Sequence, residues 1–336
     1  FLFSLYWITI SLTFDQSFHI LIPLVIIVVP AFLAIFYGLL TYLFSVFYSK
    51  NVLTSFFTFS VLFGIIEFIR GSVLTGFPWN LIAFSFVDTL NFIQIISIIG
   101  TYSFNLICIS LFTAPALFIL RTSKKEIIII SMFIFISLSF FLYGNLKIDK
   151  FNAKKNVNNS YTIRVISSNI SLDRFYSEKD ELKIIKELIE ISSPKKLRPT
   201  IFIWPEGVIS EENIIRTDIY KKLFNNNFSE DDFIILGLSS VENKNDNKLF
   251  FNSMAVLNNN LDLIFKYNKV NLVPFGEFTP FENVLNLIGF KTITNNYQSY
   301  TSGKIRVPLN IKNDKIDFKL LPLICYEIIY SGKLSK

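Results

Sequence analysis

Residues 20–47 read ILIPLVIIVVPAFLAIFYGLLTYLFSVF and contain no charged side chain. The hydrocarbon core of a bilayer is about 30 Å thick and a helix rises about 1.5 Å per residue, so roughly 20 apolar residues cross it. Pro23 and Pro30 are expected to bend the helix, which a bundle of membrane helices tolerates. The stretch therefore predicts a membrane-spanning helix and decides the fold class of the N-terminal part.

Other apolar runs lie on both sides of this stretch. They are residues 1–14, 52–69, 91–120 and 126–146. Only ten of the chain's 58 charged residues fall within residues 1–147. The contrast predicts a transmembrane helical domain of about five spans over residues 1–147, followed by a soluble domain over residues 148–336. No cleavable signal peptide is visible. The chain starts at Phe1 without a methionine, so we expect its N-terminus to be incomplete.

The basic residues of the short loops predict how the helical domain is oriented, because cytoplasmic loops collect Lys and Arg. Lys50 follows the second run, and basic residues at positions 121, 124 and 125 follow the fourth. The loop after the first run holds Asp15 and no basic residue. The alternation places the second and fourth loops in the cytoplasm, so we expect the soluble domain on the periplasmic side.

The composition argues against several classes of function. A net charge of +6 is compatible with nucleic-acid binding, but the basic residues form no stripe interleaved with aromatics. The spacing of Cys108 and Cys325 fits no metal-binding motif, and two cysteines are too few for a disulfide framework. Cys108 is interpreted as a small apolar residue that packs within a membrane helix. His19 is the single histidine, too few for a zinc site or a Ser-His-Asp triad. We expect no cofactor and no nucleic-acid partner.

After residue 160 the pattern changes to short β-rich runs separated by polar helices. Strands are expected at 161–170, 201–204, 233–238, 250–257, 261–267 and 316–325, and helices at 178–191 and 211–224. This alternation predicts a layered α/β domain.

Three polar motifs follow expected strands of this domain. They are Trp204-Pro205-Glu206, Lys269 with the segment Pro274-Phe275-Gly276-Glu277, and Cys325-Tyr326-Glu327. Loops at strand ends are where such domains place catalytic groups, since the strand holds them and the end stays accessible. Singly, each has a structural interpretation, as a turn residue, a solvated cation and a packed thiol. Their joint occurrence favours a catalytic site.

A cysteine attacks carbonyl groups as its thiolate, and at a pKa of about 8.5 little thiolate forms at neutral pH. Glu206 is the candidate base that takes the proton from Cys325. Lys269 and the backbone N–H of Tyr326 would stabilise negative charge on the attacked oxygen. Glu277 is expected to orient the ammonium or pass on a proton. Glu327 is expected to support either the site or the fold.

A second group of polar residues lies at the end of the third apolar run. Glu67 and Arg70 share a helix face, and residues 75–80, TGFPWN, follow them. One interpretation is an interfacial ion pair with Trp79 as an aromatic anchor, because Arg and Trp favour that depth. The other is that Arg70 and Trp79 contact substrate, since charges at a membrane boundary often mark a site. The sequence leaves both open.

Together these motifs resemble the nitrilase superfamily, in which a Glu-Lys-Cys triad in this order sits on an αββα fold. Residues 202–206 resemble the strand that carries the glutamate, residues 267–277 the lysine segment and residues 324–327 the nucleophile segment. The membrane helices in front narrow the resemblance to the apolipoprotein N-acyltransferases, which also have a segment similar to residues 70–79. The resemblance implies a multi-pass enzyme of the bacterial inner membrane with Glu206, Lys269 and Cys325 as its triad.

The resemblance also implies a two-step reaction without a cofactor. Cys325 would take a fatty acyl group from a membrane phospholipid as a thioester, and the N-terminal amine of a diacylglyceryl-cysteine apolipoprotein would then accept it. Two easier acyl transfers replace a difficult one. The expected partners are the phospholipid donor, the apolipoprotein acceptor and membrane lipid, and the protein is expected to be a monomer.

Several aromatic residues follow Lys269 in a segment that could meet the bilayer. They are Phe275, Phe278, Phe281 and Phe290. One hypothesis is that this segment guides acyl chains toward Cys325, with Phe275 and Phe278 in contact with substrate. The alternative is a satellite hydrophobic cluster.

Only eleven residues follow Cys325, whereas the resemblance implies further strands and another membrane helix after the nucleophile. We therefore expect a catalytic domain that is incomplete at its C-terminus and has unpaired strand edges. Such a chain is expected to be poorly stable or inactive in isolation.

Two other functions stay open from the sequence. A membrane-tethered amidase would use the same triad with water as acceptor, although a soluble substrate does not require a helical bundle. A transporter or membrane scaffold would be expected to carry several paired charges within its spans, where Glu67 and Arg70 are nearly alone.

Overall fold

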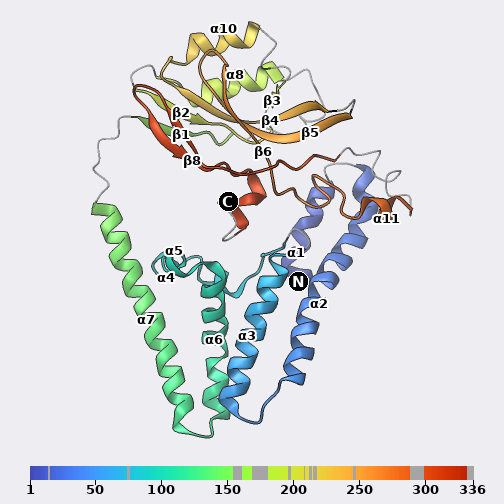
Figure 1. Cartoon of the computed structure of the whole chain (residues 1–336), viewed down its shortest axis with the longest axis vertical. Coiled ribbons are helices and arrows are strands. Elements are labelled where there is room, and N and C mark those ends of the chain that lie inside the picture. Colours follow the sequence, from blue (N-terminus) through green and yellow to red (C-terminus); the bar gives the residue numbers. More distant parts are fainter. Residues whose placement is uncertain are drawn as a thin grey trace. The chain divides into compact units, whose positions relative to one another are not determined.

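A computed structural model describes residues 1–13, 16–73, 76–153, 161–168, 181–195, 198–207, 209–211, 214, 218–244, 247–287 and 299–330. The described residues form two compact units: residues 1–153 together with Tyr330 belong to the first, and residues 161–329 belong to the second. The first unit is helical and the second is built on a sheet (Figure 1). The predicted loop residue Asp15 lies outside the described residues.

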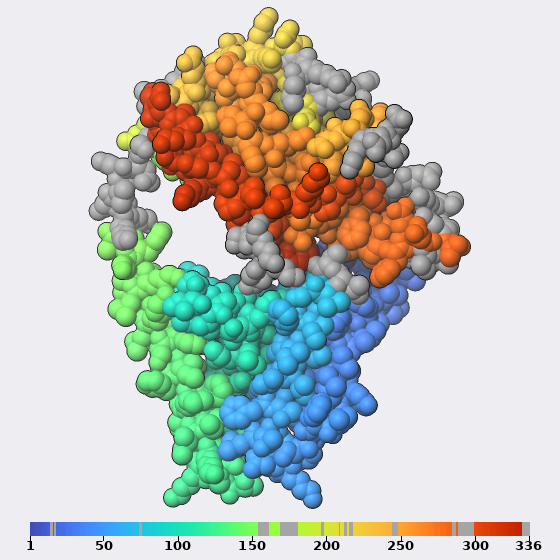
Figure 2. All heavy atoms as spheres, viewed as in Figure 1, coloured from blue at the N-terminus to red at the C-terminus, as the bar shows by residue number. Residues whose placement is uncertain are grey.

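Four helices of the first unit are long and apolar enough to cross a membrane. They are α2 (Ile22–Val46), α3 (Val52–Arg70), α6 (Thr101–Leu120) and α7 (Lys124–Ala153). Helices that follow one another in this set contact each other, and side chains fill the space between α3 and α6 (Figure 2). Many of their large apolar side chains are exposed, as expected for helices whose outer faces meet lipid.

The first predicted span does not form a long helix. Its residues fold into α1 (Leu2–Leu5) and a 3-10 helix, η1 (Tyr6–Thr13), and a second 3-10 helix, η2 (Gln16–Leu21), leads into α2. The hydroxyls of three residues of η1 each donate to the carbonyl three residues earlier, which suits the tighter winding. The described residues therefore hold four helices of spanning length, one fewer than predicted.

The fourth predicted span, residues 91–120, is broken near its start. Two short helices, α4 (Leu90–Ile93) and α5 (Ile96–Ile99), come before the long helix α6. Gly100 separates α5 from α6 and has a φ of +78°, in the left-handed region that glycine adopts without strain. The chain therefore changes direction at this glycine instead of continuing as one helix.

The core of the first unit combines residues of α4, α6 and a 3-10 helix, η3 (Ile82–Phe86). Cys108 is completely buried in this core, which confirms its interpretation as a packing residue. Gly144 of α7 lies against the backbone of Asn91, since a Cβ at this glycine would be 1.7 Å from the Asn91 carbonyl oxygen. The close approach of α4 to α7 thus depends on a residue without a side chain.

The second unit is built on a mixed sheet. Its strands are β1 (Thr162–Val165), β2 (Thr200–Ile203), β3 (Ile209–Ser210), β4 (Phe233–Lys244), β5 (Asn247–Leu257) and β6 (Leu263–Asn268). The spatial order is β1-β2-β4-β5-β6, and β3 pairs with β4. The pairings among β1, β2, β3 and β4 are parallel, whereas β4, β5 and β6 pair antiparallel.

Further elements cover both faces of this sheet. Helices α8 (Glu181–Ser192) and α10 (Asp218–Asn227) pack on one face through a large apolar cluster and lie above the sheet in Figure 1. A hairpin of β7 (Leu309–Lys312) and β8 (Asp317–Leu320) packs on the other face through Ile311 and Ile316. The prediction of a domain that layers helices on a sheet is confirmed.

Several predicted element boundaries differ from the structure. The strand predicted at 316–325 ends at Leu320, and Cys325 instead begins a 3-10 helix, η6 (Cys325–Ile329). The strand predicted at 233–238 continues to Lys244, because β4 pairs with β5 along this whole length. Parts of the elements predicted at 161–170, 178–191 and 211–224 lie outside the described residues.

Candidate active site

Glu206 lies in the turn that follows β2. The turn is fixed from two sides, because the Trp204 N–H donates to the carbonyl of Ile235 at 2.8 Å and the Trp204 indole donates to Ser192 at 2.9 Å. Gly237 of β4 lies so close that a Cβ there would be 2.5 Å from the Cα of Glu206. The backbone of the turn is therefore held rigidly, while the Glu206 side chain keeps 38% of its surface exposed.

Lys269 directly follows β6, and only 1% of its side chain is exposed. Its N–H donates to the carbonyl of Asn252 and its own carbonyl accepts from the N–H of Gly303, each at 2.8 Å. Its ammonium nitrogen lies 2.9 Å from Glu277 Oε2 and 3.8 Å from Glu206 Oε1. A cation is buried at reasonable cost only when it is paired, so these two carboxylates account for the burial.

Glu277 closes a tight turn in the lysine segment. Its N–H donates to the Val273 carbonyl and its carboxylate accepts the Val273 N–H, both at 2.8 Å. The same carboxylate accepts from Lys269 at 2.9 Å and from the side-chain amide of Asn252 at 2.6 Å. Held in this way, Glu277 is placed to orient the ammonium, one of the two roles predicted for it.

Cys325 begins η6, and its side chain is exposed. Its φ of +48° lies in the left-handed region, which costs a residue other than glycine about 1–3 kcal/mol and often occurs at functional sites. Neighbouring groups still shield part of the thiol from water, and this partial burial, followed by the negative charge of Glu206, raises the pKa of Cys325, whereas Lys269 and the N–H of Tyr326 act in the opposite direction. The structure thus brings the predicted nucleophile, base and cation together.

Glu327 is a buried carboxylate that joins the nucleophile segment to the lysine segment. Its Oε1 accepts the backbone N–H groups of Val270 and Asn271 at 2.9 and 3.0 Å. Its Oε2 accepts the N–H of Ile324 at 2.9 Å. Burial raises the pKa of Glu327, but the hydrogen bonds from Asn271, Ile324 and nearby side chains outweigh burial, so the pKa lies below its usual range. Glu327 supports the site by holding these two backbone segments together.

Two side chains that bind Glu327 were not predicted from the sequence. The Tyr267 hydroxyl donates to Glu327 at 2.8 Å, and the guanidinium of Arg306 donates to the same oxygen at 2.5 Å. Hydrogen bonds to Glu327 and Tyr267 raise the pKa of Arg306 although burial, the largest influence, lowers it. No sequence motif marked Arg306, which lies in irregular chain between α11 (Glu282–Leu287) and β7.

Asn252 of β5 is a further site residue that was not predicted. Its side-chain nitrogen donates to Glu206 Oε1 at 2.7 Å and to Glu277 Oε1 at 2.6 Å. A sequence signal for it exists, because Asn252 interrupts the apolar run FFNSMAVL at 250–257. A polar residue within a strand that is otherwise apolar needs partners when the strand is buried.

The predicted ion pair of Glu67 and Arg70 forms within the first unit. Arg70 Nη2 lies 2.9 Å from Glu67 Oε2, and both side chains are fully buried. Arg70 Nη1 donates to the carbonyls of Phe77 and Trp79 at 2.7 Å each, and Tyr37 donates to Glu67. Arg70 is therefore an anchor for the loop after α3, and its predicted contact with substrate stays a prediction. Trp79 is half-buried and stacks on Phe77.

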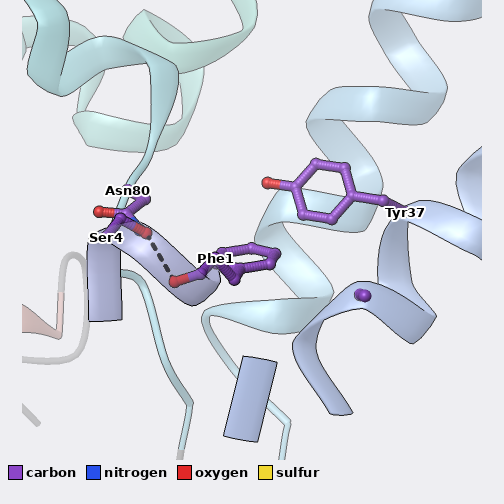
Figure 3. Close-up of a pocket in the computed structure, with 5 residues that line it drawn as sticks. Phe1, Ser4, Tyr37 and Asn80 are labelled. Carbon is purple, nitrogen blue, oxygen red and sulfur yellow. Dashed lines mark hydrogen bonds between the residues drawn. The ribbon is translucent and has the colours of Figure 1, made fainter. Parts of the chain in front are cut away.

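A cavity of about 510 Å³ lies in the first unit. Its lining is mainly apolar and consists of Phe1, Ser4, Ala34, Tyr37 and Asn80. Figure 3 shows Phe1 between Tyr37 on one side and Ser4 and Asn80 on the other. The cavity contains none of the residues predicted for the chemistry.

The aromatic residues of the lysine segment differ in exposure. Phe275 and Phe281, which precede α11, are 64% and 68% exposed, while Phe278 is half-buried. The Phe275 N–H donates to the Phe278 carbonyl at 2.7 Å, which closes the turn around Glu277. This exposure argues against a satellite cluster for Phe275 and Phe281. Phe290 lies outside the described residues.

Comparison with known proteins gives a consistent assignment. The family model of the apolipoprotein N-acyltransferase N-terminal domain matches residues 1–114. Curated apolipoprotein N-acyltransferases of Brucella melitensis and Rhizobium rhizogenes are 27% and 28% identical over 346 aligned residues, which cover 100% of this chain. That of Rhodopseudomonas palustris is 26% identical over 99% of the chain. The chain spans 63% of the length of each of these relatives.

A crystal structure of an N-terminal amidase aligns with 47% of this chain and 37% of its own at 16% identity. The TM-score of 0.25 is too low to define a shared fold. The assignment therefore rests on sequence similarity along the whole chain, which includes the segments that carry Glu206, Lys269 and Cys325. The chain is therefore similar to apolipoprotein N-acyltransferases along its whole length, and its first 114 residues match the N-terminal domain of that family.

Proposed function

We propose that this chain carries the acyl-transfer site of an apolipoprotein N-acyltransferase, with Cys325 as nucleophile, Glu206 as base and Lys269 as fixed cation. The observation that carries the proposal is the buried Lys269 ammonium between two carboxylates, 2.9 and 3.8 Å away. It lies beside an exposed thiol whose pKa responds to both Glu206 and Lys269. Acyl transfer through a thioester needs this combination of a thiol, a base and a fixed positive charge.

In the first half-reaction, Cys325 gives its proton to Glu206 as the sulfur attacks the ester carbonyl of a phospholipid. The carbonyl oxygen becomes an oxyanion, which Lys269 and the N–H of Tyr326 would stabilise. Collapse of this intermediate breaks the ester C–O bond, and the leaving alkoxide takes the proton from Glu206. The products are a thioester on Cys325 and a lysophospholipid.

In the second half-reaction, the N-terminal amine of a diacylglyceryl-cysteine apolipoprotein attacks the thioester carbonyl. Glu206 accepts the proton that the amine loses as the C–N bond forms. The C–S bond then breaks, and the departing thiolate of Cys325 recovers a proton from Glu206. The lipoprotein leaves as an amide, and the enzyme returns to its starting state.

The four long helices support a reaction between substrates that are held in a bilayer. Exposed basic residues lie at the α2–α3 and α6–α7 connections, which the positive-inside rule assigns to the cytoplasm. Residues after α7 then belong to the periplasmic face of the inner membrane. We propose residues 1–147 as the membrane anchor, residues 148–336 as a nitrilase-like αββα catalytic domain, and a monomer as the working form.

Mass spectrometry of the intact protein after incubation with phospholipid tests this proposal. We expect an added mass of one fatty acyl chain, which disappears when a lipopeptide with a free diacylglyceryl-cysteine amine is added. Cys325→Ala should abolish the adduct. Cys108→Ala is the matched control, because Cys108 is buried in α6 and should leave the adduct unchanged.

The same experiment separates the alternatives. A membrane-tethered amidase would discharge its acyl group to water at the same rate with and without lipopeptide. A scaffold or transporter would acquire no adduct on Cys325. An adduct that survives Cys325→Ala would overturn the assignment of the nucleophile.

A further inference from the structure

We infer that Asn252 is a positioning residue that holds the Glu206 carboxylate by a hydrogen bond and keeps it turned toward Cys325, so that the base is in place before substrate arrives. The inference rests on the proposed function, and it adds a residue that acts through Glu206 without touching the substrate. It is drawn from the hydrogen bonds that converge on Asn252 in β5.

Asn252 connects three of the groups that form the site. Both donors of its side-chain amide are used, one on Glu206 at 2.7 Å and one on Glu277 at 2.6 Å. Its backbone carbonyl accepts the N–H of Lys269 at 2.8 Å. One residue therefore sets the spacing between the base, the cation and the carboxylate that orients the cation.

The position of Asn252 is itself rigid. The neighbouring residue, Ser253, points to the opposite face of β5, since successive strand residues alternate. There its hydroxyl is fully buried and bonds Ser240 of β4 and Asn268 of β6, each at 2.7 Å. These contacts lock the register of the three strands that carry Asn252 and lead into Lys269.

The charges of the site explain why an amide is needed here. Glu206 and Glu277 share a single ammonium, which lies 2.9 Å from Glu277 but 3.8 Å from Glu206. The Asn252 N–H supplies Glu206 with a direct hydrogen bond that the more distant Lys269 does not. Such a bond favours the charged form of a carboxylate, and this form is the one that can take a proton from the thiol.

The test is the pH profile of acylation by p-nitrophenyl butyrate, a small ester that needs no lipid recognition. The full chain in detergent is mixed with the ester, and the pre-steady-state burst of p-nitrophenol is followed from acidic to neutral pH. The acid limb is the pH range in which the burst rate falls as the solution becomes more acidic. We expect Asn252→Ala to shift the midpoint of this limb to a higher pH by about one unit, which corresponds to the loss of one hydrogen bond to a charged group.

Asn252→Asp is the second variant, because aspartate keeps the shape of asparagine but cannot donate the two N–H hydrogen bonds. A third carboxylate makes the cluster bind a proton more tightly, so its acid limb should move further upward. Asn243→Ala is the matched control, since Asn243 is an exposed residue of β4, and its limb should stay in place. A purely structural role would reduce the burst amplitude and leave the limb where it is.

The outcomes are distinguishable from failure of the proposed function. If Asn252→Asp folds and the midpoint of its acid limb is the same as in the unmodified chain, Asn252 does not have the proposed role. This conclusion does not depend on which acyl donor the protein uses. If the unmodified chain releases a burst of p-nitrophenol from the ester but forms no thioester from phospholipid, the phospholipid is not the acyl donor. In that case the shift of the acid limb in the variants still tests the role of Asn252. If the unmodified chain releases no burst of p-nitrophenol, Cys325 is not activated, and both the proposed function and the role of Asn252 are wrong.

Discussion

Arg306 Nη2 donates to Glu327 Oε1 at 2.5 Å, and both side chains are almost completely buried. The same oxygen accepts from the backbone of the lysine segment, and the other oxygen accepts from Ile324 in the nucleophile segment. This buried pair therefore joins the two segments that carry Lys269 and Cys325. Its removal should disturb both stability and chemistry.

Glu327→Ala leaves the Arg306 guanidinium buried without its carboxylate. Breaking one side of a buried pair typically costs about 3–5 kcal/mol, because the remaining charge is uncompensated. We expect a clear fall in the thermal midpoint of the second unit, measured by circular dichroism in detergent. Asp317→Ala is the control, since Asp317 and Lys312 form an exposed pair that should contribute less than about 1 kcal/mol. Equal midpoints for the two variants would contradict this account.

The pH dependence of this effect has a definite sign. The pKa of Glu327 is lower in the folded protein than its usual value, so the unfolded chain binds the proton more tightly. The carboxylate therefore contributes stability that is present above about pH 4.3 and is lost as the pH falls through the lower folded value. The stability difference between the unmodified protein and Glu327→Gln should narrow as the pH drops below about 4.3. Urea titrations at several acidic pH values measure this difference.

The thiol of Cys325 gives an independent check on the charges of the site. Its pKa is raised by burial and by Glu206, and lowered by Lys269. Glu206→Gln removes a negative charge, so iodoacetamide should alkylate Cys325 faster at mildly alkaline pH even though acyl transfer is lost. Lys269→Met should slow alkylation at the same pH. The rates are measured in a Cys108→Ala background, so that only Cys325 is alkylated. Slower alkylation of Glu206→Gln together with faster alkylation of Lys269→Met would contradict the proposed electrostatic effects.

Local patterns were sufficient for much of this molecule. Four of the five apolar runs contain helices of membrane-spanning length, because burial in lipid requires a run of apolar residues that is visible in the sequence. Glu206, Lys269 and Cys325 were predicted as site residues because each lies in a polar motif after an expected strand, and their side chains do lie near one another in the structure. The first run does not form a helix of spanning length, because its described residues fold into the short elements α1 and η1.

The residues that were missed depend on contacts between distant segments. Asn252 reaches Glu206 only because β5 pairs with β4 in a register that places Asn252 opposite Ser239. Arg306 reaches Glu327 from irregular chain, where no periodicity predicts the direction of a side chain. Strand register and loop paths are tertiary properties, and a single sequence carries only weak signals for them.

Gly144 provides a test of packing within the first unit. A Cβ at this position would lie 1.7 Å from the carbonyl oxygen of Asn91, so Gly144→Ala must displace α4 from α7. Overpacking of this kind costs about 1–3 kcal/mol, and we expect a lower thermal midpoint in detergent. Gly38→Ala is the matched control in another membrane helix, because a Cβ there meets nothing within 4 Å. A midpoint unchanged by Gly144→Ala would show that α4 and α7 are not packed as described.

Phe275 and Phe281 are exposed aromatic residues in the segment that also holds Lys269 and Glu277. If they guide acyl chains, the double variant Phe275→Ser, Phe281→Ser should lower the rate of thioester formation from phospholipid several-fold, because less apolar surface meets the fatty chain. Acylation by p-nitrophenyl butyrate should be unaffected, since the short ester does not need that surface. Ile219→Ser removes an equally exposed apolar side chain from α10 and serves as the control. Unchanged transfer from phospholipid would reject the guiding role, whereas loss with both donors would show that the substitutions damage the turn around Glu277.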